Sequence, residues 1–275
     1  MEKDLNFVSN TADDNQEKPV ILLVDDHEEI LEFIADDLGE KFKVLVASNG
    51  IQGLEILERE IVHLVISDVM MPKMDGFEFC KRIKSGIAFS HIPVILLTAK
   101  NSLQSKIEGL ELGADVYIEK PFSPEFLQVQ ALSLIANRNK IKAYFSSSPL
   151  LHIKSIAYSK ADEQFLKKIQ MIIDQAISNP QLDVDLLTDH MNMSRPTLYR
   201  KIKSISNLSP NELINLARLK KAAELLNEGT LKIYEIAEMV GYSSQTHFGR
   251  IFAKQFGMSP TDYAASMYAN QKKKV

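Results

Sequence analysis

The chain of 275 residues has one cysteine and no apolar run long enough to cross a membrane. The single cysteine, Cys80, excludes a framework of disulfides within the chain and is typical of a reducing compartment. A membrane helix needs about 20 apolar residues, and no segment approaches that length. The N-terminal segment also lacks the basic start and apolar stretch of a signal peptide. We therefore expect a cytoplasmic protein without a membrane segment.

Charge is distributed unevenly along the chain. Residues 1–159 hold 16 Lys/Arg and 24 Asp/Glu, whereas residues 160–275 hold 16 and 12, so the two parts carry net charges of −8 and +4. An acidic part favours a cation as its ligand, and a basic part favours a polyanion. The length exceeds that of one small domain, so we expect two domains with different ligands.

Apolar, strand-like runs alternate with helix-like segments between residues 19 and 138. The expected strands are 20–24, 43–47, 64–67, 93–97 and 116–118. Three of them are almost entirely apolar, as strands buried on both faces of a parallel sheet are. Five strand–helix units in about 120 residues predict a single doubly wound α/β domain.

Polar residues follow four of these strands. They are Asp25 and Asp26 after the first, Asp68 after the third, Thr98 after the fourth and Lys120 after the fifth. Since the carboxyl ends of parallel strands share one edge of the sheet, these side chains should converge. Close carboxylates favour a hard cation such as Mg²⁺ and leave one carboxylate as a nucleophile for a phosphoryl group. The lysine and threonine would contact phosphoryl oxygens.

A strand-end aspartate nucleophile with Mg²⁺ is also typical of phosphatases of the haloacid dehalogenase type. Such an enzyme needs a second aspartate two residues after the nucleophile, where this chain has Met70. The sequence therefore disfavours this enzyme class. His27, directly after the acidic pair, is interpreted as a solvated loop residue rather than a ligand.

Residues 19–138 resemble the receiver domain of two-component response regulators. The matching motifs agree in order and spacing and are Val24-Asp25-Asp26, Asp68-Val69-Met70-Met71-Pro72, Met74-Asp75-Gly76, Thr98-Ala99, Gly113-Ala114-Asp115-Val116-Tyr117 and Lys120-Pro121-Phe122. The resemblance implies a flavodoxin-like, five-stranded parallel sheet in the order 2-1-3-4-5.

The resemblance also implies a role for each residue of the acidic site. Asp68 would accept a phosphoryl group from a histidine kinase and become an aspartyl phosphate. Asp26 and Asp68, with the backbone carbonyl of Met70, would bind Mg²⁺, and Asp25 would assist through water. Thr98 and Lys120 would complete the catalytic group.

A switch is implied as well. Thr98 would move toward the phosphate, and Tyr117 would turn inward to fill the vacated space. The bond between Lys120 and Pro121 would be cis, which is essentially an option of proline.

The basic part lacks strand signals between Glu163 and Tyr263, so we predict an all-α domain of about seven short helices. Two helix-turn-helix patterns are present, at 184–203 and 233–255. A short helix, a tight turn and a second helix with polar, basic outward residues is the geometry that enters a DNA major groove.

The outward residues of each second helix are the candidates for DNA contact. They are Arg195, Pro196, Tyr199, Arg200 and Lys203 in the first motif, and Gln245, Thr246, His247 and Arg250 in the second. Arginine suits guanine edges and glutamine suits adenine edges. Pro196 can touch bases only by van der Waals contact. Lys201, Lys203 and Lys254 are predicted to contact phosphates.

Residues 163–267 resemble the DNA-binding domains of the AraC/XylS family. The resemblance is carried by Ile236-Ala237, Val240-Gly241-Tyr242, Phe248, Arg250, Phe252, Lys254, Phe256-Gly257-Met258-Ser259-Pro260 and Tyr263. It implies two motifs joined by a long helix, here 211–226, that read groove segments about 34 Å apart. It also implies that Tyr199, Arg200, Gln245, Thr246 and Arg250 contact bases.

Together these patterns predict a phosphorylation-controlled transcription factor. It would form a homodimer when phosphorylated and bind double-stranded DNA with repeated half-sites. It would not be an enzyme beyond its own phosphotransfer and autodephosphorylation. The expected segments are a flexible leader at 1–18, the receiver at 19–138, a linker at 139–163, the DNA-binding domain at 164–267 and a basic tail at 268–275.

Two alternatives stay open. The chain could be the C-terminal part of a hybrid sensor histidine kinase of the Bacteroidetes type, which the domain order and the junction at 146–151 resemble. It could also be a phosphorelay or protein-interaction module whose helical part does not bind DNA.

Overall fold

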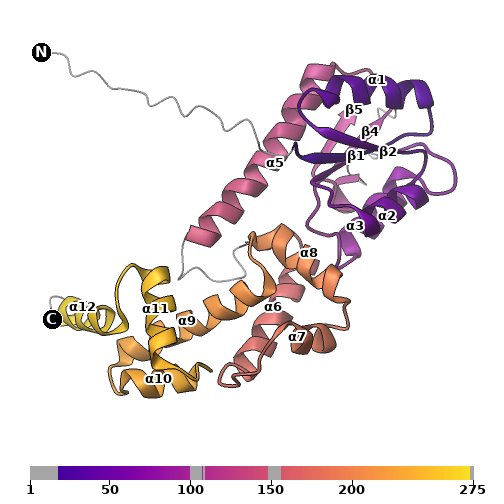
Figure 1. The fold of residues 1–275 in the computed structure, drawn as a ribbon. Coiled ribbons are helices and arrows are strands. Elements are labelled where there is room, and N and C mark those ends of the chain that lie inside the picture. The colour runs from indigo at the N-terminus through magenta and orange to yellow at the C-terminus, as the bar shows by residue number, and fades with distance from the viewer. Residues whose placement is uncertain (1–17, 100–106, 108, 148–155, 273–275) are drawn as a thin grey trace, which may run out of the picture.

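The computed structural model describes residues 18–99, 107, 109–147 and 156–272 (Figure 1). The predicted leader therefore lies outside the described residues except for Lys18. The same holds for residues 148–155 of the predicted linker and for the last three residues of the predicted basic tail.

The first domain contains a five-stranded parallel sheet. Its strands are β1 (Val20–Val24), β2 (Lys43–Ala47), β3 (Leu64–Asp68), β4 (Val94–Thr98) and β5 (Val116–Glu119). They lie in the order β2-β1-β3-β4-β5, which confirms the predicted doubly wound, flavodoxin-like fold. The strand bounds differ from the predicted ones by at most one residue.

Four described helices cover the two faces of the sheet, namely α1 (Glu28–Gly39), α2 (Gly50–Arg59), α3 (Gly76–Ser85) and α5 (Pro124–Ser147). Helices α1 and α5 lie on one face and α2 and α3 on the other (Figure 1). Alternate strand residues supply the two cores: Leu23 packs with α1 and α5, whereas Leu22 packs with α2 and α3. This period of two follows from the pleat of the strands.

Helix α5 continues to Ser147, beyond position 138 where the receiver was predicted to end. Residues 139–147 contain good helix formers and neither glycine nor proline, so nothing stops the helix there. The next helix begins at Lys160, capped by Ser159, whose hydroxyl accepts a hydrogen bond from the Asp162 amide. Both helices thus enter the predicted linker at 139–163, and α5 packs against α8.

The second domain consists, in its described part, of seven helices and no strands, as predicted. They are α6 (Lys160–Gln175), α7 (Val184–Met191), α8 (Arg195–Ser206), α9 (Pro210–Glu228), α10 (Ile233–Met239), α11 (Gln245–Phe256) and α12 (Pro260–Lys272). Serine hydroxyls cap α8, α9 and α11, because each accepts a bond from an amide of the first turn. The two helix-turn-helix units are therefore α7–α8 and α10–α11.

Helix α9 joins the two units and shares its side chains between their cores. Leu213 and Ile214 pack with α6, α7 and α8, whereas Leu219 and Leu226 pack with α10, α11 and α12. Figure 1 shows α9 running from the first unit to the second, with α10, α11 and α12 at the end remote from the receiver.

Arg218 of α9 ties the loops of both units together. Its Nη2 donates to the Asn179 carbonyl before α7 at 2.6 Å, and its Nη1 donates to the Gly241 carbonyl before α11 at 3.2 Å. Gly241 has a φ of +78°, and a Cβ there would lie 2.6 Å from the Ile177 carbonyl oxygen, so only glycine fits this close approach.

None of the helices in the described part of the chain combines the length and the hydropathy that a bilayer span requires.

Candidate functional site

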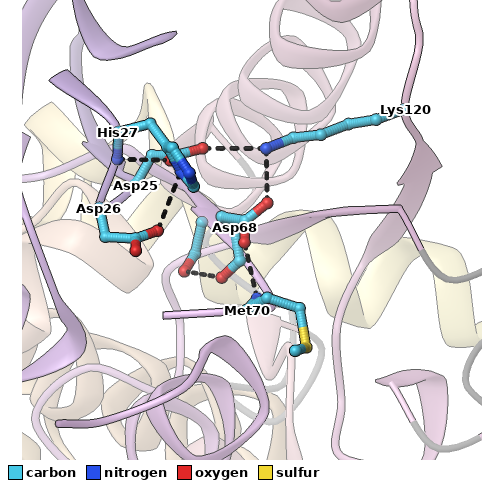
Figure 2. A network of polar contacts seen from close by, with 7 residues as sticks. Asp25, Asp26, His27, Asp68, Met70 and Lys120 are labelled. Carbon is cyan, nitrogen blue, oxygen red and sulfur yellow. Dashed lines mark hydrogen bonds and ion pairs between the residues drawn. The ribbon is translucent and has the colours of Figure 1, made fainter. Parts of the chain in front are cut away.

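The acidic residues predicted to converge do so at the carboxyl edge of the sheet (Figure 2). Asp25 is fully buried and Asp68 is 6% exposed. Lys120 lies between them, and its Nζ donates to Asp25 Oδ2 at 2.9 Å and to Asp68 Oδ1 at 2.5 Å. The lysine from the loop after β5 therefore holds the carboxylates of β1 and β3 together.

The second oxygen of Asp68 is fixed by the loop that follows β3. Oδ2 accepts a hydrogen bond from the Met70 amide at 2.6 Å. The loop turns back so sharply that Gly76 lies against the end of β3. A Cβ on Gly76 would lie 2.1 Å from the Asp68 carbonyl oxygen. This close approach was not predicted, because Gly76 was identified only as part of the receiver motif Met74-Asp75-Gly76.

His27 lies closer to the carboxylates than the sequence indicated. Its side chain is 65% exposed, as predicted, yet Nδ1 is 3.1 Å from Asp25 Oδ1 and 3.2 Å from Asp26 Oδ1. The hydrogen bond to Asp25 and the charge of Asp26 raise the pKa of His27. The oxygens of Asp25 and Asp26 and the nitrogen of His27 form a group that is compact enough to hold a metal ion.

Burial and charge act in opposite directions on Asp68. Burial raises the pKa of its carboxyl group, and the hydrogen bond and charge of Lys120 oppose that effect without cancelling it. Burial lowers the pKa of Lys120, but its hydrogen bonds to Asp68 and Asp25 outweigh burial, so the net shift is upward. Lys120 is consequently a firmly held cation.

The composition of the site fits a divalent cation. Three carboxylates, Asp25, Asp26 and Asp68, lie at this edge of the sheet, and the ammonium group of Lys120 contacts only Asp25 and Asp68, which leaves an excess of negative charge in a partly buried site. Carboxylate oxygens are the ligands that Mg²⁺ prefers, and Asp26 is open enough to solvent to leave room for the waters of its octahedron.

The two residues of the predicted switch also lie near this edge. Thr98 is fully buried at the end of β4, and its carbonyl accepts from the Lys120 amide at 2.7 Å. The ring of Tyr117 lies against Gly109, where a Cβ would be 3.0 Å from it, and its hydroxyl is buried without a partner in the described part of the chain. The predicted cis bond between Lys120 and Pro121 is confirmed.

The reading face of the second helix-turn-helix unit is exposed as predicted. The inward residues Phe248 and Phe252 of α11 are fully buried. The predicted contact residues of α11 are all solvent-exposed and are Gln245, Thr246, His247 and Arg250.

The first unit agrees only in part. Leu198 and Ile202 of α8 are buried, and the exposed predicted contacts are Arg195, Pro196, Tyr199 and Lys203. Arg200 is half-buried, because its Nη1 donates to the Glu58 carbonyl of the receiver at 2.6 Å. Lys201 is buried against Asp162, so the prediction that it contacts DNA phosphates is wrong for this arrangement.

Comparisons with known proteins identify a family for each of the two domains. Residues 21–131 match the family described as response regulator receiver domain, and residues 187–266 match one described as helix-turn-helix domain. A relative named "Histidine kinase P4", from Formosa agariphila, is 41% identical over 90% of this chain and 18% of its own length. "Probable transcriptional regulator ycf29" of Pyropia yezoensis is 33% identical over 67% of this chain and 87% of its own length.

Among solved structures, a response regulator receiver domain protein from Methanospirillum hungatei is 29% identical. It covers 45% of this chain and 98% of its own, with a TM-score of 0.43. The chain spans less than two thirds of several curated relatives, for example 59% of "Probable transcriptional regulator ycf27" of Porphyra purpurea. The receiver match, the helix-turn-helix match and the ycf29 relative together show that the chain belongs to the two-component response regulators, with a receiver domain followed by an AraC-type helix-turn-helix domain.

Proposed function

We propose that the chain is a phosphorylation-regulated, sequence-specific DNA-binding regulator of transcription. The observation that carries the proposal is the buried Asp68 carboxylate, held between Lys120 Nζ and the Met70 amide in the same chain as an exposed reading helix. A response regulator with this output domain has no enzymatic activity beyond its own phosphotransfer and autodephosphorylation. It acts in the cytoplasm, as a homodimer when phosphorylated, on DNA with repeated half-sites.

In the proposed reaction an Asp68 oxygen attacks the phosphorus of a phosphohistidine on a histidine kinase. A P–O bond forms while the P–N bond breaks, and the imidazole leaves with its electron pair. Lys120 and the Met70 amide already donate to the Asp68 carboxylate, so they are close enough to stabilise charge on a group transferred to it. When bound, Mg²⁺ would neutralise phosphoryl oxygens, and Asp26, Asp68 and the Met70 carbonyl would hold it, with Asp25 assisting through water.

The phosphorylated site would act on the rest of the molecule through the switch pair. The Thr98 hydroxyl would donate to a phosphoryl oxygen, and Tyr117 would turn further inward. Support for the latter comes from the buried Tyr117 hydroxyl, which has no partner in the described structure and so is not anchored by a hydrogen bond. The proposed domains are the receiver at 19–138 and the DNA-binding domain at 164–267, joined by residues 139–163.

A second candidate follows from one comparison. Because 90% of this chain matches 18% of a histidine kinase, the same two domains can form the output of a hybrid sensor. In that case the phosphodonor would be a kinase domain of the same polypeptide. The coding sequence upstream of Met1 decides between the candidates, since only a hybrid has a kinase reading frame in register.

Selection from a pool of random-sequence duplexes, with and without acetyl phosphate and Mg²⁺, tests the proposed function. We expect enrichment of repeated half-sites and tighter binding after phosphorylation, because a dimer gains avidity on two half-sites. Absence of sequence enrichment in both conditions would refute sequence-specific binding and favour a phosphorelay or protein-interaction module.

Arg250→Ala should weaken binding at one base position of the selected site by about 1–3 kcal/mol, because it removes one side chain from the exposed face of α11. Affinities for single-base variants of that site provide the measurement. Lys254→Ala, an exposed position on the same helix, is the matched control and should weaken all sequences equally. An equally uniform loss for Arg250→Ala would identify Arg250 as a phosphate contact instead.

A further inference from the structure

Helix α8 docks on the receiver through a buried lysine. The side chains of Lys201 in α8 and Asp162 in α6 are both fully buried, and Lys201 Nζ lies 2.5 Å from Asp162 Oδ1. The ammonium also reaches Ser90 Oγ at 2.8 Å and His91 Nδ1 at 3.2 Å. All three N–H donors of the lysine therefore have an acceptor.

The receiver supplies two of these three acceptors. Ser90 and His91 follow α3, and Ser90 Oγ donates to Asp162 Oδ1 at 2.7 Å while it accepts from Lys201. Burial and the charge of Lys201 lower the pKa of His91 well below its usual value, which favours the neutral ring whose Nδ1 can accept from the ammonium. Ser90 and His91 of the receiver thus cover the ion pair between Asp162 of α6 and Lys201 of α8.

The polar contacts continue from this ion pair to the start of β5. The Tyr158 amide donates to Asp162 Oδ2 at 3.3 Å, and the Tyr158 ring lies 3.9 Å from the guanidinium carbon of Arg138 in α5. Arg138 Nη2 in turn donates to Asp115 Oδ1 at 2.8 Å. Asp115 is two residues before Tyr117, so the interface connects to the strand that carries the proposed switch residue.

A second contact engages a predicted base-reading residue. Arg200 Nη1 donates to the carbonyl of Glu58, which lies in the last turn of α2, where carbonyls lack partners within the helix. The negative end of the helix dipole favours a cation at this place. Arg250, the corresponding candidate on α11, is exposed. Among the described residues, the receiver therefore contacts a predicted base-reading residue of α8 and none of α11.

The energetics of such an interface favour a reversible contact. Burial lowers the pKa of Lys201 to about 8, which shows that removal of its ammonium from water is costly. Attraction within a buried ion pair offsets this desolvation only when geometry and additional hydrogen bonds are good. The net contribution of the ion pair to stability is therefore small, although the arrangement of its partners is specific.

We propose that Ser90, His91, Asp162 and Lys201 form a latch by which the receiver holds α8 and withholds its Arg200 from DNA, while the predicted contact residues of α11 remain exposed. Opening the latch would release Arg200 from the Glu58 carbonyl and add it to the residues of α8 and α11 that can contact one duplex. This inference rests on the proposed DNA-binding function, and it locates the control of that function at the interface between receiver and α8.

Ser90→Arg tests the latch from the receiver side and leaves the helical domain unchanged. The new guanidinium would face the Lys201 ammonium in a site where Ser90 is 1% exposed, so docking should fail. We expect affinity for a pool of random-sequence duplexes, measured by fluorescence anisotropy on the unphosphorylated full chain, to rise about tenfold, which corresponds to one open molecule in ten before the change. Ser85→Arg adds the same charge at an exposed position of α3 and should give a much smaller change.

A decrease in DNA affinity, or no change relative to the control variant, would overturn the proposal. Equal affinities for Ser90→Arg and Ser85→Arg would show that docking does not limit DNA binding, and weaker binding by Ser90→Arg would show that docking supports it. Should Ser90→Arg fail to fold, Ser90→Ala removes the hydroxyl with little change in volume and should give a smaller gain in the same direction.

Lysine acylation followed by mass spectrometry tests the latch without DNA. Lys203 is exposed on the same helix and serves as the internal reference for Lys201. We expect Lys201 to be protected in the unchanged chain and to react more readily in Ser90→Arg. Equal reactivity of both lysines in the unchanged chain would refute the latch, whereas absence of DNA binding in every variant, with Lys201 protected, would refute the proposed function and leave the interface intact.

Discussion

Asp68→Asn should abolish phosphoryl labelling of the chain by acetyl phosphate in the presence of Mg²⁺. The amide has nearly the same shape as the carboxylate, and its oxygen can still accept from the Met70 amide, so the fold should persist. It lacks, however, the negative oxygen that attacks phosphorus. Intact-protein mass spectrometry should therefore find the phosphoryl adduct on the unchanged chain and none on the variant.

Asp75→Asn is the matched control for this experiment. Asp75 lies seven positions from Asp68 in the numbering, is exposed and caps α3 by accepting from the Glu78 amide at 2.8 Å. Asparagine caps helices about as well as aspartate, so this variant should label like the unchanged chain. Retention of an acid-labile phosphoryl group on Asp68→Asn would show that another residue is the acceptor.

Asp162→Ala should produce the largest loss of stability among substitutions at the interface. It leaves the fully buried Lys201 ammonium without its carboxylate, and loss of one partner of a buried ion pair costs about 3–5 kcal/mol. For a domain of this size the thermal transition of the helical part should fall by roughly 10–20 °C in calorimetry. If the receiver undocks in this variant, water can solvate the Lys201 ammonium, and the loss of stability would then be about 3 kcal/mol.

Two further variants isolate the cause. Asp174→Ala changes an exposed aspartate on the same helix and should alter stability by about 0.5 kcal/mol or less. Combining Asp162→Ala with Lys201→Met removes the buried charge and should restore much of the lost stability. If Asp162→Ala matched Asp174→Ala, Lys201 would have to be solvated in the folded chain.

The sheet and the acidic site were predictable because both depend on local patterns. A buried parallel strand requires a continuous apolar run, so 64–67 and 93–97 stand out in the sequence, and the observed strands lie within one residue of them. The rule that ligands bind beyond the carboxyl ends of parallel strands then brings Asp25, Asp68 and Lys120 together without any knowledge of coordinates. The seven helices of the second domain follow similarly from caps and periodicity.

The contacts between the domains were not predictable from such patterns. Lys201 occurs in a basic, amphipathic helix and looks like a solvated residue, but its partners Asp162 and Ser90 lie 39 and 111 positions away. The docking of one folded domain on another leaves no periodic trace in the sequence. The same applies in a smaller way to His27, whose proximity to both carboxylates depends on the loop after β1.

The bridge made by Arg218 has a consequence for the architecture of the operator. Since the Arg218 side chain bonds to the loops before α7 and α11, it restricts movement of the two helix-turn-helix units relative to each other. If α8 and α11 bind one duplex as proposed, one additional base pair between their two groove segments turns the second segment by roughly 34° about the duplex axis. DNA with altered spacing would then have to twist or bend to match, and the elastic cost would fall on the DNA.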